Sequence, residues 1–407
     1  MQKSQITRIL HPSGKLYEAY CTFVMGHPEG SFYQSDAFFR LLEQWPEASP
    51  VLLIMVDQRH QVQGSLLAVV ISDGRGMQKW LSTRTIVYGG PLMAPQRRLQ
   101  EHMNVDALLK ALIKEVDRRS VFIEFRNFRD WSDLQPVFNS NGFRYEERLN
   151  MLVGTSRRIK AWRGLSDSRR RQVRKSLQHG ATIVVNPGTD QLRAFYRILQ
   201  ELYAKRVKKP LPSLQFFEAF AQMCRAGSYE APMPDTMRAT PLQETGVRDS
   251  GLLTGLSGLA DAAPELFNTA ADTPSGQSSQ VAPGDRPGVV MLVTYQGEVV
   301  GGIVCAMMPG RAMYEWYVAG LDRQLKGKGI YPSVLVTWSA IEYAAANHLR
   351  YFDFMGMGVP DEPYGVRDFK ARFGGEWVNH GRFMRVNNKV KYMLAKLGYR
   401  AWQAVGS

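Results

Sequence analysis

The segment from residue 313 to 383 constrains the fold most, because strand, loop, helix and strand patterns follow one another in it without a gap. Residues 314–319 are typical of a strand, and Pro332 suits the first turn of a helix. Residues 351–354 return as a strand. Apolar side chains in the helix recur on one face, at Val334, Leu335, Trp338, Ile341 and Ala345.

Two loops in this segment carry residues that suggest chemistry. Before the helix, Gln324, Gly327 and Gly329 form a Gln-x-x-Gly-x-Gly pattern, which would present backbone N–H groups to an anion at the helix N-terminus. After the second strand, residues 369–375 read Phe-Lys-Ala-Arg-Phe-Gly-Gly, so that Lys370 stands on a constrained loop between aromatic residues and glycines.

The same order of elements occurs twice in the chain. In the second half, strands are expected at 289–295, 299–307, 313–319 and 351–354. In the first half, strands are expected at 51–56, 63–71, 78–88 and 121–126, with a helix at 105–118. This repeat predicts an α+β fold of two tandem domains, each a mixed, mainly antiparallel sheet flanked by helices.

The expected domains are residues 1–150, joined by a C-terminal helix at 385–407, and residues 151–384. Residues 228–288 interrupt the second domain with many glycines, prolines, serines and threonines, no lysine and only two aromatic residues. Such a composition buries too little surface to offset the entropy of ordering. We predict a disordered insertion, either an inert loop or a tethering or regulatory segment.

Charge is spread unevenly along the chain. The insertion carries eight acidic residues and three arginines, so the remainder is even more basic than the net charge of +14 suggests. Such a surplus attracts polyanions, whether tRNA, nucleotide diphosphates, lipid phosphates or an anionic membrane face. The charge alone does not choose among them.

The apolar runs, the N-terminal sequence, the cysteines and the histidines indicate where the protein is located and whether it binds a metal. The longest apolar runs, 51–56 and 66–71, fall well short of the ~20 residues of a membrane span, so no integral membrane segment is expected. No apolar signal-peptide core follows Met1. We expect a cytoplasmic protein, with peripheral attachment to the inner membrane face left open. Neither the three cysteines nor the seven histidines have metal-ligand spacing, so no metal site is predicted.

The order of strands, anion-binding loop, helix and strand is that of the GNAT acyltransferases, and the pattern at Gln324 fits their pyrophosphate loop. Further residues make the chain resemble one branch, the Fem family of aminoacyltransferases, which build peptidoglycan interpeptide bridges. The stretches that carry this resemblance are residues 169–178 with the helix ending at Arg206, residues 338–356, and residues 369–376. Residues 32–35 and 86–91 match more loosely, and Phe38 and Leu42 stand where members often carry tryptophan and lysine.

The resemblance implies an acyltransferase that moves an aminoacyl group from aminoacyl-tRNA to an amine of a peptidoglycan precursor, free or lipid-linked at the membrane surface. No tightly bound cofactor is implied. The pattern at Gln324 fits acyl-CoA enzymes better than Fem members, so an acyl-CoA-dependent N-acyltransferase acting on another cell-envelope amine remains the alternative. In that case Gln324, Gly327 and Gly329 would bind the donor.

Three residues are candidates for catalysis. Lys370 would offset negative charge on the tetrahedral intermediate or on a substrate phosphate, or else is a solvated lysine in a turn. Asp353, between aromatic residues, is either paired structurally or poised as an acid–base group with a raised pKa. Glu315 stands where many GNAT enzymes place a base, but a salt bridge at the core rim explains it equally.

Substrate contacts are expected from four further residues: Phe369, Arg206, Arg372 and Tyr364. The resemblance implies a substrate role for Phe369 and a phosphate contact for Arg206, although a cation at a helix C-terminus also has a purely structural explanation. The tail at 389–402 alternates apolar and basic residues, which suits packing onto the first domain or binding to a membrane.

Overall fold

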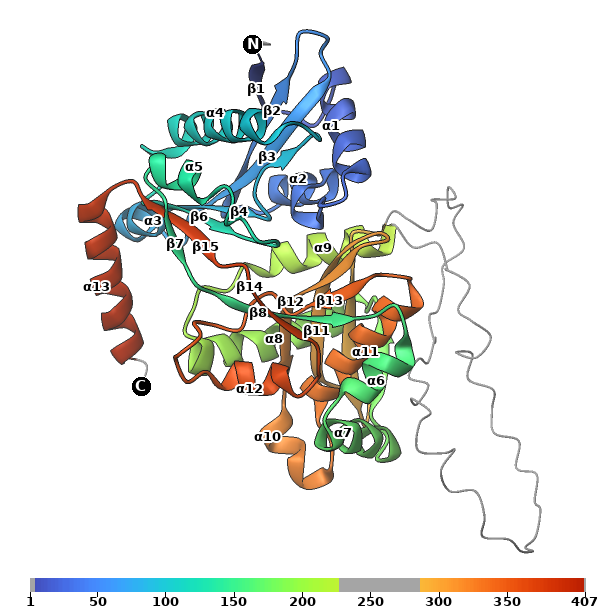
Figure 1. The fold of residues 1–407 in the computed structure, drawn as a ribbon. Coiled ribbons are helices and arrows are strands. Elements are labelled where there is room, and N and C mark those ends of the chain that lie inside the picture. The colour runs from blue at the N-terminus through green and yellow to red at the C-terminus, as the bar shows by residue number, and fades with distance from the viewer. Residues whose placement is uncertain (1–3, 227–285, 406–407) are drawn as a thin grey trace, which may run out of the picture.

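The computed structural model describes residues 4–226 and 286–405, which form two mixed β-sheets with helices on both faces of each (Figure 1). The predicted α+β fold with two tandem units is confirmed. The insertion predicted at 228–288 lies outside the described residues up to residue 285.

The first sheet has the strand order β1-β2-β3-β4-β6-β15-β7, with β5 beside β3. Its strands are β1 (Gln5–Ile9), β2 (Ala48–Val56), β3 (Val62–Ile71), β4 (Arg84–Tyr88), β5 (Leu92–Met93), β6 (Phe122–Arg126), β7 (Arg144–Glu146) and β15 (Arg382–Val386). Strands β4 and β6 run parallel, and the other neighbouring pairs are antiparallel. Strand β15, from the C-terminal end of the chain, therefore fills the place between β6 and β7.

The second sheet has the order β14-β8-β13-β12-β11-β10-β9. Its strands are β8 (Leu149–Gly154), β9 (Thr182–Val185), β10 (Gly288–Tyr295), β11 (Glu298–Met308), β12 (Ala312–Gly320), β13 (Tyr351–Asp353) and β14 (Glu376–Asn379). Strands β12 and β13 pair in parallel only as far as Tyr314 and Asp353. Beyond that pair β12 continues without β13, so the two strands separate at the residue that follows each.

A β-bulge in β12 lies next to this separation. The pairing of β11 with β12 shifts between Val304 and Cys305, which leaves Trp316 as the extra residue. As a result, Trp316 and Tyr317 both pack against one aromatic cluster. The preceding residue, Glu315, instead contacts Lys370.

The helices form layers on either side of the two sheets. Those of the first unit are α1 (Lys15–Gly26), α2 (Asp36–Glu43), α3 (Gly76–Ser82), α4 (Arg98–Val116), α5 (Gln135–Ser140) and α13 (Lys389–Val405), with the 3₁₀ turn η1 (Phe32–Gln34). Those of the second are α6 (Arg158–Gly164), α7 (Asp167–Gln178), α8 (Thr189–Leu202), α9 (Leu214–Ala226), α10 (Asp322–Leu325), α11 (Pro332–Ala346) and α12 (Gly365–Ala371), with the π-helical turn η2 (Tyr203–Val207) and the 3₁₀ turn η4 (Lys326–Lys328).

Three apolar cores follow from these layers. Helices α4 and α5 close one core on the outer face of the first sheet. Helices α6, α7 and α11 close a second core on the outer face of the second sheet. The third lies between the sheets and takes residues from α1, α2, α8 and α9.

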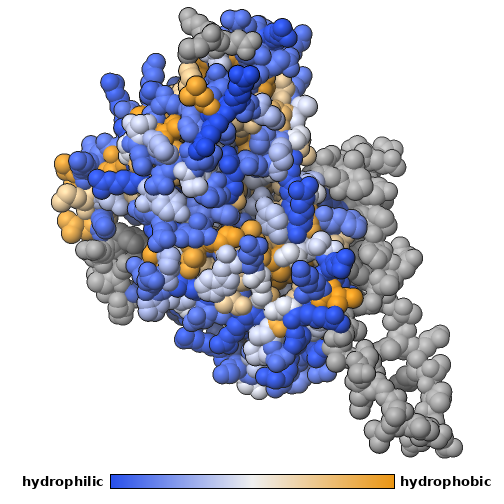
Figure 2. Space-filling model, viewed as in Figure 1, coloured by the Kyte–Doolittle hydropathy of each residue, from blue (hydrophilic) through white to orange (hydrophobic). Residues whose placement is uncertain are grey.

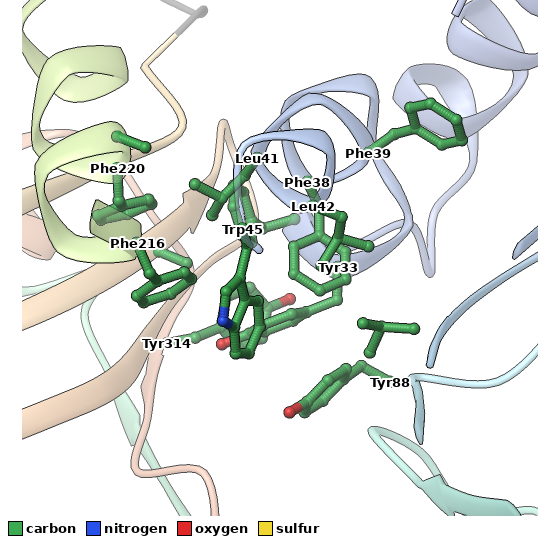
Figure 3. Packing of buried hydrophobic residues seen from close by; sticks show 14 of the residues in the cluster. Tyr33, Phe38, Phe39, Leu41, Leu42, Trp45, Tyr88, Phe216, Phe220 and Tyr314 are labelled. Atoms are coloured by element: carbon green, nitrogen blue, oxygen red, sulfur yellow. The ribbon is translucent and has the colours of Figure 1, made fainter. Parts of the chain in front are cut away.

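Aromatic side chains from both units meet in this middle core (Figure 3). Tyr33 of η1 stacks on Tyr88 with ring centroids 4.6 Å apart, and it meets the ring of Tyr314 from the second sheet at 5.4 Å. Phe38 and Trp316 also pack on each other across the boundary. Because aromatic rings bury large areas, this contact holds the two units together as one body.

Arg311 ties the units at a second point. It lies in the turn between β11 and β12 and donates to the carbonyl oxygens of Met25 at 2.5 Å and Gly30 at 2.8 Å. A cation at the C-terminus of α1 also complements the helix dipole. A Cβ at Gly30 would lie 2.4 Å from the backbone carbonyl oxygen of Val24 as well as 2.3 Å from the guanidinium, so a larger residue would displace the backbone there.

Several expectations differ from the structure. Residues 78–88, expected as one strand, form α3 followed by β4, because exposed Met77 and Trp80 give no alternation of buried side chains. Helix α4 begins seven residues before the expected 105. Helix α11, expected to be apolar on one face, is buried on nearly all sides because it lies between the second sheet and α6 and α7.

The course of the chain at the domain boundary also differs in detail. Strand β15 begins at Arg382 and already belongs to the first sheet, although residues up to 384 were assigned to the second domain. Strand β8 begins at Leu149 and belongs to the second sheet. No helix in the described part of the chain has the length and apolar character to cross a bilayer.

Candidate functional site

A buried ion pair lies where β12 and β13 separate. Lys370 Nζ of α12 is 2.9 Å from Glu315 Oε1 of β12, and both side chains are buried. The ammonium also donates to the carbonyl oxygens of Phe354 and of Gly356, the latter at 3.2 Å. All three N–H donors of Lys370 therefore have acceptors within the chain.

This environment differs from the one expected for Lys370. The residue lies on a helix rather than a loop, and its ammonium is buried rather than solvated. Burial raises the pKa of Glu315, and the charge of Lys370 opposes that shift. Glu315 Oε2 has no hydrogen-bond partner among the described residues, so it is still able to accept a proton or an N–H group.

Asp353, the last residue of β13, stands beside this pair with only 3% of its surface exposed. Its Oδ1 accepts from Asn150 Nδ2 at 2.7 Å and from the Met355 N–H at 2.6 Å. Burial raises its pKa to about 6, although these hydrogen bonds and the charge of Lys370 oppose the shift. Asp353 is thus able to exchange a proton near neutral pH.

The loop after Asp353 has an unusual backbone. Met355 has φ of 57°, and Gly356 and Gly358 also have positive φ. A left-handed methionine is uncommon, and such residues persist where surrounding contacts hold them. Here Asp353 accepts from the Met355 N–H, and Lys370 binds the carbonyl of Gly356. The carboxylate and the ammonium together fix the shape of this loop.

A small pocket of about 50 Å³ opens between the two units next to this loop. Its second-unit wall includes Asn150, which bonds Asp353, together with Met355 and Gly356. The first unit contributes residues from the ends of β6 and β15 and the segment between β7 and β8. Its polar and charged lining residues are Arg126, Asn127, Arg148, Asn150, His380 and Arg382.

Arginines outnumber carboxylates around this pocket. Glu124 Oε1 accepts from Arg126 at 2.8 Å and from Arg382 at 2.7 Å. Although burial opposes the shift, the charges of these arginines hold the pKa of Glu124 at about 2. Burial and the neighbouring Arg126 lower the pKa of Arg382 to about 10. One carboxylate therefore serves two crowded guanidinium groups, which favours an additional anion.

The predicted donor loop is packed more tightly than an open anion cradle. Gly329 has φ of 74°, and a Cβ there would lie 2.4 Å from Lys175 Cε of α7. Acceptors within the chain already take the N–H groups of Gly329, Ile330, Tyr331 and Ser333. The acceptor for Ser333 is Asp322 Oδ1, so a carboxylate occupies the N-terminus of α11. Gln324 and Gly327 are exposed at the surface.

Three of the four predicted substrate residues lie on α12 or next to its ends, and the fourth lies on η2. Tyr364 is exposed beside Gly358, and Phe369 precedes Lys370 on the helix. Arg372 is exposed just after α12, where its carbonyl oxygen accepts from the Ser166 N–H. Arg206 is exposed on η2, a π-helical turn of the kind often found at functional sites.

Sequence reasoning missed several residues of the site. Burial raises the pKa of Tyr203 on η2 to about 12, with smaller contributions from Tyr364 and Glu315. Arg169, which sequence analysis named only as the start of the stretch 169–178, is buried with its guanidinium 4.4 Å from the Phe369 ring centre. No sequence pattern pointed to Asn150, because only the fold brings it next to Asp353. No group of metal-binding side chains occurs within residues 4–226 and 286–405.

Comparisons with known proteins agree with this architecture. Residues 279–370 match the model of the acetyltransferase (GNAT) domain. A crystal structure of FemX superimposes with a TM-score of 0.59 at 14% identity, covering 95% of this chain and 99% of that one. The C-terminal domain of a putative lysylphosphatidylglycerol synthetase from Agrobacterium fabrum aligns at 12% identity with a TM-score of 0.47, covering 93% of each chain. No curated protein matches significantly.

The fold is thus similar over 95% of the chain to that of FemX, and residues 279–370 within the second unit match a GNAT domain. The predicted acyltransferase class is confirmed by the GNAT domain in the second half of the chain. The roles of individual site residues remain predictions.

Proposed function

We propose that this GNAT acyltransferase is a Fem-type enzyme on the cytoplasmic side of the membrane, which transfers an aminoacyl group from aminoacyl-tRNA to an amine of a peptidoglycan precursor. The observation that carries the proposal is the arginine-lined pocket beside Asp353. It offers a binding place for an anionic acceptor within reach of a buried carboxylate whose pKa is about 6.

The anionic part of the acceptor would bind at Arg126 and Arg382, whose charges exceed that of Glu124. A phosphate or carboxylate suits paired guanidinium groups because it accepts from both at once. The acceptor amine would then lie near Asp353, on the Asn150 side of the pocket. The charge of the pocket thus supports an acceptor that carries phosphate or carboxylate groups.

In the reaction, the acceptor amine attacks the ester carbonyl carbon of the aminoacyl group and forms the new C–N bond. Asp353 takes the proton that the amine loses, since its raised pKa makes the carboxylate a usable base near neutral pH. The C–O bond to the terminal ribose then breaks, and the released hydroxyl takes a proton. Lys370 holds the loop and pairs with Glu315, so its role is to position Asp353.

The donor loop supports an aminoacyl ester over a CoA thioester. The diphosphate of CoA needs free N–H donors at the start of α11, whereas Asp322 already accepts there. Its negative charge would also repel a diphosphate. An aminoacyl-tRNA needs no such cradle, so a loop whose N–H groups already have acceptors is compatible with that donor.

The decisive experiment incubates the full chain with charged tRNAs and a peptidoglycan precursor, and measures the product by mass spectrometry. The expected product is a precursor extended by one amino acid. Absence of transfer from every aminoacyl-tRNA would reject the proposal.

One observation favours a second candidate, an acyl-CoA-dependent N-acyltransferase acting on another cell-envelope amine. Residues 279–370 match an acetyltransferase domain, and this stretch includes Gln324, Gly327 and Gly329. Calorimetry with CoA separates the two candidates, because micromolar binding would favour the second.

A further inference from the structure

An apolar stripe runs along the outer side of α13. Its residues follow the spacing i, i+3, i+4 and i+7, which places them on one helical face. They are Val390 (68% exposed), Met393 (64%), Leu394 (46%) and Leu397 (60%). The opposite side packs inward, since Tyr392 meets Phe122 and Lys391 lies 4.2 Å over the Trp80 ring. The tail therefore packs on the first unit through the face opposite the stripe, and the stripe itself stays exposed.

Helix α3 extends this surface. It lies beside α13 (Figure 1) and exposes Met77 (77%) and Trp80 (51%). Figure 2 shows apolar side chains in orange at the edge of the molecule where Figure 1 places the start of α13. We call the stripe on α13 together with Met77 and Trp80 the α3–α13 surface.

The charged residues on helices α3 and α13 are all basic. Lys389 and Lys396 are exposed on α13, and Arg75 and Lys79 are exposed at α3. Residues 74–84 and 389–405 contain no aspartate or glutamate. An apolar helical face bordered by cations combines the features by which amphipathic helices bind the headgroup region of a bilayer.

A second copy of the chain fits this surface poorly. In a two-fold contact the same patch lies on both partners, so the cations of α3 and α13 would meet partner helices that carry no acidic residue. An anionic bilayer instead accepts the apolar side chains between its acyl chains and attracts the cations to its headgroups. We propose that the α3–α13 surface binds the anionic face of a lipid bilayer.

The position of the surface links it to the pocket. Arg382 lines the pocket at one end of β15, and α13 starts three residues after the other end at Val386. At about 3.3 Å per residue, the strand separates the two by roughly 17 Å. If the proposed transfer is correct, a bilayer-bound protein takes a lipid-linked acceptor whose phosphates stand at the headgroups; the bilayer contact itself does not depend on that transfer.

Co-sedimentation of the full chain with vesicles tests the inference. Vesicles of phosphatidylglycerol mixed with phosphatidylcholine should bind the protein, and pure phosphatidylcholine should bind it at least roughly tenfold more weakly. Binding should also fall between about 0.1 M and about 1 M salt. The double change Met393→Glu, Leu397→Glu should lower binding to anionic vesicles by roughly tenfold or more, because both side chains are exposed and their loss leaves the core intact.

The matched control is the double change Leu99→Glu, Met103→Glu, which adds the same two charges at exposed apolar residues four apart on α4 and should leave binding unchanged. Equal binding to the two kinds of vesicle, or an equal effect of the control, would overturn the inference. So would a dimer in sedimentation equilibrium that the double change converts to a monomer, since the surface would then bind a second copy. A chain without transferase activity that still bound anionic vesicles would reject the proposed function and leave this inference standing.

Discussion

At the scale of single residues, Asp353 is stabilised as a neutral acid. The pKa of Asp353 lies above that of an unfolded aspartate, so the folded state holds the proton more tightly. Its contribution to stability is therefore fully present below about pH 4 and is lost as the pH rises through about 6. Activity should rise over the same range if the carboxylate is the base.

Asp353→Asn should separate these two effects. The amide keeps the oxygen that Asn150 and the Met355 N–H bind, and it removes a buried charge at neutral pH. The free energy of unfolding should increase by about 3 kcal/mol or less at pH 7.5 and change little at pH 4, while transfer is lost. Urea denaturation at the two pH values and a transfer assay check this. A variant that keeps its activity would remove Asp353 from the chemistry.

Lys370 and Glu315 should behave as a structural unit. Lys370→Met leaves Glu315 buried without its cation, which should cost about 3–5 kcal/mol of stability. Adding Glu315→Gln removes the unpaired charge and should restore much of that loss. Urea denaturation of the single and double variants measures the coupling. Equal stability of Lys370→Met and the unchanged chain would argue against the buried pair.

At the scale of elements, Gly327→Glu tests the donor loop without disturbing it. A Cβ at Gly327 meets no atom within 4 Å and its φ is not positive. Gly329, in contrast, has a positive φ, and a Cβ there would clash with Lys175. If aminoacyl-tRNA is the donor, transfer should persist in this variant. Kinetics with charged tRNA check the result, with Gly188→Glu at the start of α8 as the control. Micromolar CoA binding that Gly327→Glu abolishes would instead favour the acyl-CoA enzyme.

The predictability of each element followed its burial pattern. Strands β10, β11 and β12 and helix α11 were predicted almost to their ends, because buried apolar runs and turn residues mark them. The stretch that became α3 was not, since its apolar side chains are exposed. Periodicity assigns secondary structure by assuming that apolar residues are buried, so exposed apolar residues such as Met77 and Trp80 lead to a wrong assignment.

The site was predictable only within local segments. Lys370, Asp353 and Glu315 were singled out from their neighbours in the chain, and the structure brings them together. The partners of these residues come from remote segments, as Asn150 does for Asp353. The arginine-lined pocket combines residues of β6 and β15. No local sequence pattern predicts that β15, which follows the second unit in the chain, pairs within the first sheet.

At the scale of the whole molecule, the pocket between the units should control acceptor affinity. Arg382→Gln removes one cation from it and should raise the KM for the acceptor roughly tenfold with little change in kcat, since a charge-assisted hydrogen bond contributes about 1.5–3 kcal/mol. Steady-state kinetics check this. Arg385→Gln, on the same strand but bonded to Asn387, is the control. An unchanged KM would place the acceptor elsewhere.

The position of β15 between β6 and β7 also affects how the chain is made. The first sheet lacks an internal strand until residues 382–386 have left the ribosome, long after β7 has emerged. At about 5–20 residues per second, synthesis of the intervening residues takes roughly 10 to 50 s. Throughout that time β6 and β7 have unpaired edges, which are sites for aggregation. The N-terminal half should therefore not mature before the C-terminus is synthesised, and nascent chains will need protection by chaperones until then.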